Sequence, residues 1–380
     1  MNKRFRAIFL QLHLWIGLTS GILIFIISIT GSIYVFSEDI KKIIDQGDLK
    51  FDVSSKSKRV SLTRLVSIAE DVFDNQYNYQ NILVPNFLHQ PISVIFQKTN
   101  EEKFGYPSYM EFHKTVYLNP YTGEVVKVEN TKWEFFNVVF WIHTTLFMGH
   151  NEISNYVIVI TVWVFIFSLL SGIVLWWPRN SKGFKPGLKF SWKSYTKWKR
   201  KNLDLHKVLG FYACLIGLIF GLTGLLWASK SFNTSIKWLA NGGQEITEEE
   251  LPDATNNRIA NPLDEILHQV LKKIPQSKYV LIREHPNEKV PYIVRSYVDE
   301  TVNYTRIEMY YDKASAELLL QEEFSGKNNG EKIQSLNYDL HVGTIGGLPT
   351  KILAFIMSLI IASLPVTGFL FWLGRRNYVG

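Results

Sequence analysis

Four long uncharged stretches constrain the fold of this chain more than any other feature. Each is at least as long as the roughly 20 apolar residues that a helix needs to cross about 30 Å of hydrocarbon. A helix in a soluble core would be shorter and would carry a polar stripe. The sequence therefore predicts an α-helical membrane protein with four transmembrane helices. The stretches are Leu10–Phe36, Ile153–Trp177, Val208–Ser229 and Ile352–Gly374.

The distribution of charge predicts the orientation of these helices. The net charge is +7, and the connection from Arg179 to Lys201 holds nine basic residues and no acid. Of the 34 acidic residues, only Asp204 lies outside residues 37–154 and 229–340. Because Lys and Arg gather on cytoplasmic loops, we expect both termini and the middle loop in the cytoplasm and the two long segments outside. The basic loop is interpreted as a topology signal that contacts the lipid bilayer, not as a nucleic-acid site.

Two further features narrow the possibilities. The first apolar stretch is longer than that of a signal peptide, and no clear cleavage site follows it, so we expect a retained anchor. The single cysteine, Cys214, excludes a disulfide framework, an iron–sulfur cluster and a CxxC redox pair. No GxGxxG, P-loop, HExxH or GxSxG motif is present, so no flavin or nicotinamide domain is expected.

The four stretches match in two pairs, which predicts an internal repeat of the order helix, soluble domain, helix. The first and third open with a histidine followed four residues later by a glycine, and the second and fourth each follow a histidine. Repeats of this kind commonly place functional sites between the copies. The matching segments are His13–Gly17 with His206–Gly210, Ile29–Tyr34 with Leu222–Trp227, and Leu170–Arg179 with Val366–Arg375.

The two long segments each predict a small α+β domain with an antiparallel sheet. In each, an amphipathic helix, residues 61–73 or 261–271, precedes strand-like runs and a turn. The strands are expected at Asn81–Val84, Ile92–Gln97, Lys114–Leu118 and Glu124–Val128, then at Tyr279–Arg283, Tyr292–Tyr297 and Thr305–Tyr311. The turns are expected at Asn119–Gly123 and Asp312–Ser315.

These patterns divide the chain into seven parts. Residues 1–36 are the N-terminus and first transmembrane helix, and residues 37–132 are the first outer domain. Residues 133–178 are a histidine-bearing segment with the second helix, followed by the basic loop at 179–204 and the third helix at 205–229. Residues 230–335 are the second outer domain, and residues 336–380 are a histidine-bearing segment, the fourth helix and the tail.

Four of the nine histidines occupy matched positions in the repeat. An ionisable group at a membrane helix is a functional hypothesis by default, although a single histidine near the interface is often merely half in water. His13 and His206 begin outward-running helices, which places both near the cytoplasmic side. His143 and His341 precede inward-running helices, which places both near the outer side. Two histidines on facing helices can supply both axial ligands of one haem iron.

Glycines near these histidines favour a flat cofactor. Gly17 and Gly210 each lie four residues after a histidine, on the same helix face. Gly21, Gly217 and Gly221 continue that face, although small residues at this spacing are also a helix-packing device. Two haems, one per leaflet, would divide about 30 Å of hydrocarbon. The sequence therefore predicts a transmembrane electron conduit.

Two points stay open in this interpretation. His150, seven residues after His143, is an alternative ligand in its place. The electron donor is unidentified, and another protein, a quinol or a soluble reductant would each serve.

Over essentially its whole length, the sequence resembles the PepSY-associated transmembrane proteins, which include inner-membrane ferric-siderophore reductases and PiuB-like iron-regulated proteins. The second outer domain departs from the family turn, because Tyr311–Glu317 lacks its proline and glycine. The resemblance rests on Leu12–Gly17, on His143 with Ser171–Arg179, on Leu205–Gly210, on Leu340-His341 and on the PepSY-like turn Tyr117–Glu124.

The resemblance implies a fuller function than the residues alone. It implies two b-type haems per chain, held by His13 with His206 and by His143 with His341. It implies reduction of ferric siderophores or other iron(III) chelates in the periplasm, during iron uptake across a bacterial inner membrane. Two alternatives remain: a non-enzymatic module whose PepSY domains bind or regulate an outer partner, and a haem conduit that serves a different acceptor. No residue is assigned a catalytic role.

Overall fold

The computed structural model describes residues 3–49, 51, 58–87, 89–178, 183–245, 258–287 and 289–376. The chain divides into two compact units. We call Met1–Phe36, Val139–Thr234 and Leu340–Gly380 the helical unit, and Ser37–Val138 with Ser235–Asp339 the sheet unit. Two basic residues of the predicted topology signal, Arg179 and Lys182, lie outside the described residues.

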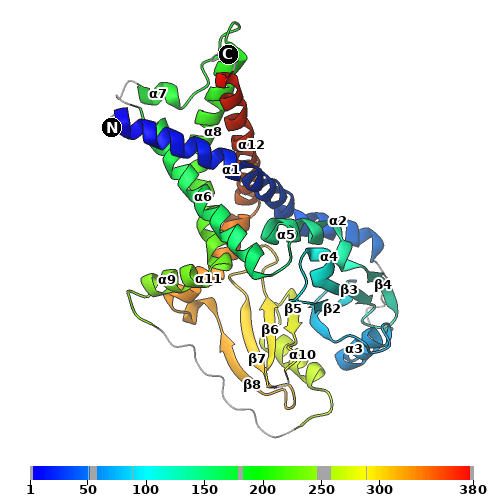
Figure 1. The fold of residues 1–380 in the computed structure, drawn as a ribbon. Helices are drawn as coiled ribbons and strands as arrows, with labels where there is room; N and C mark the ends of the chain where they lie inside the picture. The colour runs from blue at the N-terminus through cyan, green and yellow to red at the C-terminus, as the bar shows by residue number, and fades with distance from the viewer. Residues whose placement is uncertain are drawn as a thin grey trace. The chain divides into compact units, whose positions relative to one another are not determined.

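The helical unit holds four helices that are long and apolar enough to cross a membrane, within the part of the chain described (Figure 1). They are α1 (Lys3–Val35), α6 (Glu152–Trp176), α8 (Trp198–Ala228) and α12 (Leu348–Arg376). The predicted membrane class is confirmed, and these four helices are the candidate spans. Helix α1 packs against α6 and α12, and α8 packs against the same two helices. Helices α1 and α8 are therefore diagonal to each other in the bundle.

Three glycines that the sequence suggested as room for a cofactor instead allow the helices to approach. A Cβ added at Gly217 would meet Leu169 at 2.9 Å, and one at Gly221 would meet Ile166 at 2.8 Å. A Cβ at Gly21 would meet that of Pro365 at 3.2 Å. These contacts are those of small residues at a membrane helix interface. The expectation that Gly21, Gly217 and Gly221 line a cofactor cavity is therefore replaced by a packing role.

Two shorter helices precede the second and fourth spans and carry histidines. Helix α5 (Phe135–Thr145) leads to α6, and α11 (Asn329–Val342) leads to α12. After α11 the chain turns at Gly343, which has a φ of +86° and would place a Cβ 2.7 Å from the carbonyl of Thr350. The other helices are α2 (Ser37–Asp48), α3 (Leu62–Asp71), α4 (Tyr106–Tyr109), α7 (Phe184–Gly187), α9 (Lys230–Ala240) and α10 (Pro262–Lys273).

The strands of both long segments form one antiparallel sheet in the order β4-β3-β2-β1-β5-β6-β7-β8. Strand β1 pairs with β5, and Ile82 lies opposite Ile282. The sequence predicts two separate sheets, but the structure joins them edge to edge, because the two opening strands pair with each other. The strands are β1 (Tyr79–Pro85), β2 (Ile92–Thr99), β3 (Met110–Leu118), β4 (Val125–Glu129), β5 (Tyr279–Arg283), β6 (Tyr292–Tyr297), β7 (Ile307–Tyr311) and β8 (Leu318–Glu322). Strand β8 was not predicted.

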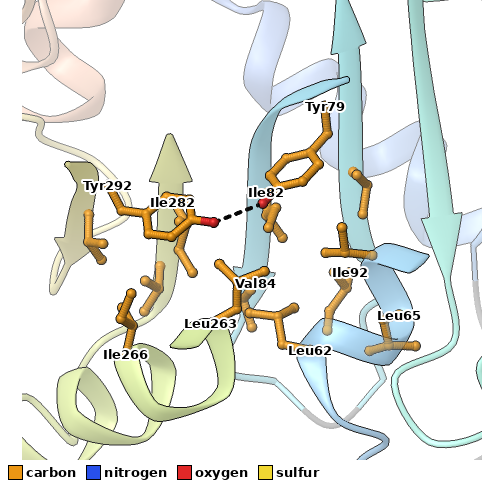
Figure 2. Close-up of a cluster of buried hydrophobic side chains, with 14 of the residues drawn as sticks. Leu62, Leu65, Tyr79, Ile82, Val84, Ile92, Leu263, Ile266, Ile282 and Tyr292 are labelled. Carbon is orange, nitrogen blue, oxygen red and sulfur yellow. Dashed lines mark hydrogen bonds between the residues drawn. The ribbon is translucent and has the colours of Figure 1, made fainter. Parts of the chain in front are cut away.

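Helices α3 and α10 pack on this sheet and close its core. Leu65 of α3 and Ile266 of α10 are fully buried, as are Ile82 and Ile282 at the junction of β1 and β5 (Figure 2). The Asp264 carboxylate of α10 accepts hydrogen bonds from the first backbone amides of α3. A carboxylate at a helix N-terminus satisfies amides that have no partner within the helix. The two segments thus share one hydrophobic core, and a residue of the second segment caps the helix of the first.

The two turns that follow β3 and β7 have the same conformation despite different sequences. The Gly123 amide donates to the Asn119 carbonyl, and Gly123 has a φ of +77°. In the second turn, the Ala316 amide donates to the Asp312 carbonyl, and Ala316 has a φ of +56°. The Asp312 carboxylate also accepts from the amides of the next residues. The second turn therefore keeps the conformation of the first without a glycine. Ala316 adopts the left-handed backbone conformation, which is unfavourable for residues other than glycine.

The sheet unit contains a titratable group whose charge is disfavoured in the fold. Burial, and then the charge of Lys41, lower the pKa of His113 to about 4, while Glu129 acts in the opposite direction. The His113 Nδ1 atom is buried and has no hydrogen-bond partner. Because the unfolded chain binds the proton near pH 6.5, His113 opposes folding as the pH falls from about 6.5 to about 4.

We expect His113→Gln to weaken this acid sensitivity. The wild-type chain should lose roughly 2–3 kcal/mol between pH 7 and pH 4 through His113, and the variant should not. Thermal unfolding of the full chain in detergent, measured across this pH range, gives both slopes. The two slopes should coincide above pH 7, which serves as the internal control, and equal slopes below pH 6 would contradict the assignment.

Candidate functional site

The helical unit brings the four predicted histidines together as two pairs. In the first pair, the ring centroids of His13 on α1 and His206 on α8 are 6.1 Å apart. In the second pair, those of His143 on α5 and His341 on α11 are 6.0 Å apart. All four side chains are half-buried. Each pair therefore takes one histidine from each half of the chain.

The two pairs lie at opposite ends of the bundle. His13 belongs to the first pair, and Thr30, 17 positions later on the same helix, lies beside His143 of the second pair. At 1.5 Å per residue, these positions are about 25 Å apart along α1. This separation is close to the roughly 30 Å of hydrocarbon that the bundle would cross. The two pairs are therefore separated by most of the length of a membrane-spanning helix.

Each imidazole is held through its Nδ1 atom by a neighbouring helix. In the first pair, His13 Nδ1 lies 2.9 Å from Ser171 Oγ of α6, and His206 Nδ1 lies 3.0 Å from Thr367 Oγ1 of α12. The His206 Nδ1 atom is also 3.1 Å from the carbonyl oxygen of Leu364. Helices α6 and α12, which pack against both α1 and α8, therefore orient the two imidazoles of the first pair.

In the second pair, α8 and α1 supply the Nδ1 partners, whereas in the first pair these helices carry the histidines. His341 Nδ1 lies 2.7 Å from Thr223 Oγ1 of α8. His143 Nδ1 lies 2.8 Å from the carbonyl oxygen of Ile27 on α1 and 3.4 Å from Thr30 Oγ1. In all four cases, the atom left for a ligand is Nε2.

A glycine next to each hydroxyl residue accommodates the imidazole ring. A Cβ at Gly31 would lie 2.9 Å from Cε1 of His143, and one at Gly368 would lie 3.3 Å from Cε1 of His206. Gly172 and Gly224 face His13 and His341 in the same way, at 3.4 and 3.7 Å. We call Thr30-Gly31, Ser171-Gly172, Thr223-Gly224 and Thr367-Gly368 the hydroxyl–glycine pairs.

The predicted glycines Gly17 and Gly210 have a different setting. A Cβ at Gly17 would meet nothing within 4 Å, and one at Gly210 would meet only the end of Leu364, at 3.7 Å or more. Neither position is a close helix contact, but only Gly17 has open space beside it, because a Cβ at Gly210 would be in van der Waals contact with Leu364. Open space of this kind is the feature that the sequence suggested for a flat cofactor.

The remaining histidines do not enter either pair. His150 lies against Trp141, with ring centroids 4.9 Å apart, and the structure places His143 beside His341 in the position for which His150 was the alternative. His341 itself is flanked by Trp227 and Phe220, at 5.2 and 5.8 Å between centroids. His89, His113, His268 and His285 lie in the sheet unit.

The donor set suits a cofactor that needs two protein ligands on one axis. A metal ion bound to two imidazoles at about 2 Å puts the ring centroids roughly 6 Å apart, as in both pairs. Among the described residues, no group of three or more His, Cys, Asp or Glu side chains is arranged to hold a metal ion. A four-ligand structural site is thus a poor match for these residues. Two imidazoles in an apolar bundle match the donor type that can hold a haem iron, which each histidine pair would supply.

Comparison with known families supports the membrane assignment. The family model described as PepSY-associated TM region matches residues 10–375. The chain belongs to the PepSY-associated transmembrane family. The predicted membership is therefore confirmed, and it extends over both units of this PepSY-associated protein. No curated protein matches the sequence significantly.

The hydroxyl–glycine pairs are the part of the site that sequence reasoning missed in this PepSY-associated protein. In the sequence, the four dipeptides are parts of the segments that match between the repeats, and nothing there indicates a role for them. Their recurrence in all four spans was the available signal. It did not indicate that each dipeptide contacts a histidine 113 to 161 positions away.

The glycines permit a matched test of this packing. Gly31→Ala would force the His143 ring to move, because the new Cβ would lie 2.9 Å from it. Gly224→Ala, at the equivalent place, introduces an ordinary contact of 3.7 Å with His341. We expect Gly31→Ala to destabilise the chain by about 1–3 kcal/mol, the usual cost of overpacking, and Gly224→Ala by less than about 1 kcal/mol.

Thermal unfolding of the two variants in the same detergent measures this difference. A larger loss in Gly224→Ala than in Gly31→Ala would contradict the described contacts.

Proposed function

We propose that this protein is a membrane electron conduit with two haem b groups, one at each histidine pair. The observation that carries the proposal is the geometry of the pairs: two imidazoles with Nδ1 held by a neighbouring helix and with ring centroids about 6 Å apart, at two separate positions in one bundle. The apolar bundle suits the macrocycle. When bound, haem iron supplies a one-electron carrier.

Different residues of the chain would hold each of the two haem groups. His13 and His206 would hold the cytoplasmic-side iron, and His143 and His341 would hold the outer-side iron. Gly17 keeps the helix face after His13 open, and Gly210 admits the end of the Leu364 side chain beside His206. The nearby Trp227 and Phe220 cover His341 with apolar surface, which limits access of water to that imidazole.

We infer the orientation of the bundle in the membrane from the distribution of charge. The basic middle loop and basic termini favour the cytoplasm, which places the first pair on the cytoplasmic side of a bacterial inner membrane. The sheet unit then lies in the periplasm, and its two halves are a repeat of one PepSY-like domain. The similar strand order on either side of the β1–β5 junction supports this duplication.

The acceptor that fits best is a ferric chelate of the siderophore class in the periplasm. One electron from an unidentified cytoplasmic-side donor, which is oxidised, converts Fe(III) in the chelate to Fe(II). Hard oxygen donors hold Fe(II) more weakly, so the metal is released for uptake. The sequence resemblance to ferric-siderophore reductases favours this acceptor.

Haem counting in ligand variants tests the conduit. The purified wild-type chain should show a Soret band and two haems per chain by pyridine haemochrome. His13→Ala and His341→Ala should each lose one haem, because each removes one ligand of a different pair. His150→Ala is the matched control and should retain both. A wild-type chain without a Soret band would falsify the proposal and would favour a non-enzymatic PepSY module.

The acceptor is tested separately with the dithionite-reduced protein. Addition of a ferric siderophore should reoxidise the haems, with loss of the reduced α-band and formation of Fe(II) trapped by ferrozine. The gallium(III) form of the same siderophore is the control, because Ga(III) binds similarly and accepts no electron under these conditions. Haems that stay reduced with the ferric chelate would indicate a conduit for a different acceptor.

A further inference from the structure

The hydroxyl–glycine pairs share a hydrogen-bond arrangement that fixes how each hydroxyl meets its histidine. A Ser or Thr hydroxyl has one proton to donate and two lone pairs to accept with. In each hydroxyl–glycine pair, the hydroxyl lies within hydrogen-bond distance of a backbone carbonyl of its own helix. Thr223 Oγ1 donates to the Ile219 carbonyl at 2.6 Å, and Thr30 Oγ1 donates to the Ile26 carbonyl at 2.6 Å.

The other two hydroxyls do the same. Ser171 Oγ donates to the Ser168 carbonyl at 3.1 Å, and Thr367 Oγ1 donates to the Ser363 carbonyl at 3.0 Å. This back-bonding to the previous turn is typical of hydroxyl residues in membrane helices. With its proton committed to the helix, each hydroxyl can only accept from the imidazole.

Backbone carbonyls lead to the same assignment independently. The carbonyls of Ile27 and Leu364 lie 2.8 and 3.1 Å from Nδ1 of His143 and His206. A carbonyl cannot donate, so Nδ1 must carry the hydrogen in both histidines. The hydrogen-bond pattern therefore assigns the same tautomer to all four neutral imidazoles, with the proton on Nδ1 and the lone pair on Nε2.

We propose that the hydroxyls of Ser171, Thr223 and Thr367 are positioning groups that hold their imidazoles in the Nδ1–H tautomer and so present Nε2 as an iron ligand. For His143, the closer acceptor is the carbonyl of Ile27. This role rests on the proposed haem function. A ligating histidine that donates its other N–H to a fixed acceptor is held in orientation and becomes a more basic ligand. The hydroxyls therefore stabilise Fe(III) relative to Fe(II) and lower the reduction potential of each haem.

The two threonines beside the second histidine pair differ in how closely they approach an imidazole. Thr223 Oγ1 is the close partner of His341, at 2.7 Å. Thr30 Oγ1 is only 3.4 Å from His143 Nδ1, and the Ile27 carbonyl at 2.8 Å is the closer acceptor there. The same substitution at Thr223 and Thr30 thus removes a short hydrogen bond in one case and a weak contact in the other. Both changes affect the same haem.

The test compares Thr223→Val with Thr30→Val in the full haem-loaded protein by spectroelectrochemical titration. Valine keeps the shape of threonine and removes the hydroxyl. We expect Thr223→Val to raise the potential of one of the two haems and Thr30→Val to leave both near their wild-type values. Thr223→Ser, which restores a hydroxyl, should return the potential toward that of the wild type.

The outcomes separate this role from the proposed function. Absence of haem from the wild-type chain overturns the proposed function and the positioning role together. Two haems whose potentials respond equally to both valine variants, or to neither, overturn the positioning role alone. If Thr223→Val loses haem, retention in Thr223→Ser supports the role, and loss in both variants overturns it.

A second measurement addresses the tautomer directly. The ¹⁵N spectrum of histidine-labelled full chain distinguishes Nδ1–H from Nε2–H imidazoles. Four histidines with a protonated Nδ1, of which one changes in Thr223→Val, support the assignment. An Nε2–H form at His13, His143, His206 or His341 overturns it.

Discussion

The hydrogen bond from each imidazole Nδ1 to a neighbouring helix is the interaction on which the rest of the site depends. A neutral imidazole has one N–H and one lone pair, so an acceptor at Nδ1 leaves the lone pair on Nε2. Ser171 and Thr367 place that acceptor on α6 and α12, the two helices that separate α1 from α8. The site is therefore built from the helix packing itself, and a change in packing would turn the histidines away from each other.

The arrangement also links the two halves of the chain. Each histidine is held by a hydroxyl–glycine pair from its own half, because His13 contacts Ser171 and His206 contacts Thr367. The ring that it faces belongs to the other half. Support is thus local to one half, whereas a complete pair needs both. The same division holds in the sheet unit, where each half supplies four strands and β1 with β5 joins them.

Joining the two segments at β1 and β5 removes two sheet edges that would otherwise be exposed. An unpaired edge presents free amides and carbonyls that invite pairing with other chains. Val84 and Val280 at this junction are almost fully buried, as are Ile82 and Ile282. The α3 and α10 helices cover the same junction, and Asp264 caps α3 from the second segment. One larger core results, and a larger core stabilises a domain better than two small ones.

The sequence by itself determined the class of the protein and much of its local structure. The four spans follow from hydrophobic length, and most strands follow from the alternation of apolar residues; β5 and β6 lie at the predicted positions. The choice of His13, His143, His206 and His341 follows from matched positions alone. These features are readable because they depend on short-range periodicity.

Only the tertiary structure decided which groups meet. Alternation in a strand does not identify its partner, so the β1–β5 junction was not predictable from either segment. The close packing of Gly217 against Leu169 and the contact of Thr223 with His341 join residues 48 and 118 positions apart. A hydroxyl residue near the end of an apolar helix carries no local sign of the histidine that it will hold. The sequence therefore determined which histidines occupy matched positions, and helix packing decided which acceptor each imidazole meets, because those acceptors are supplied by another helix.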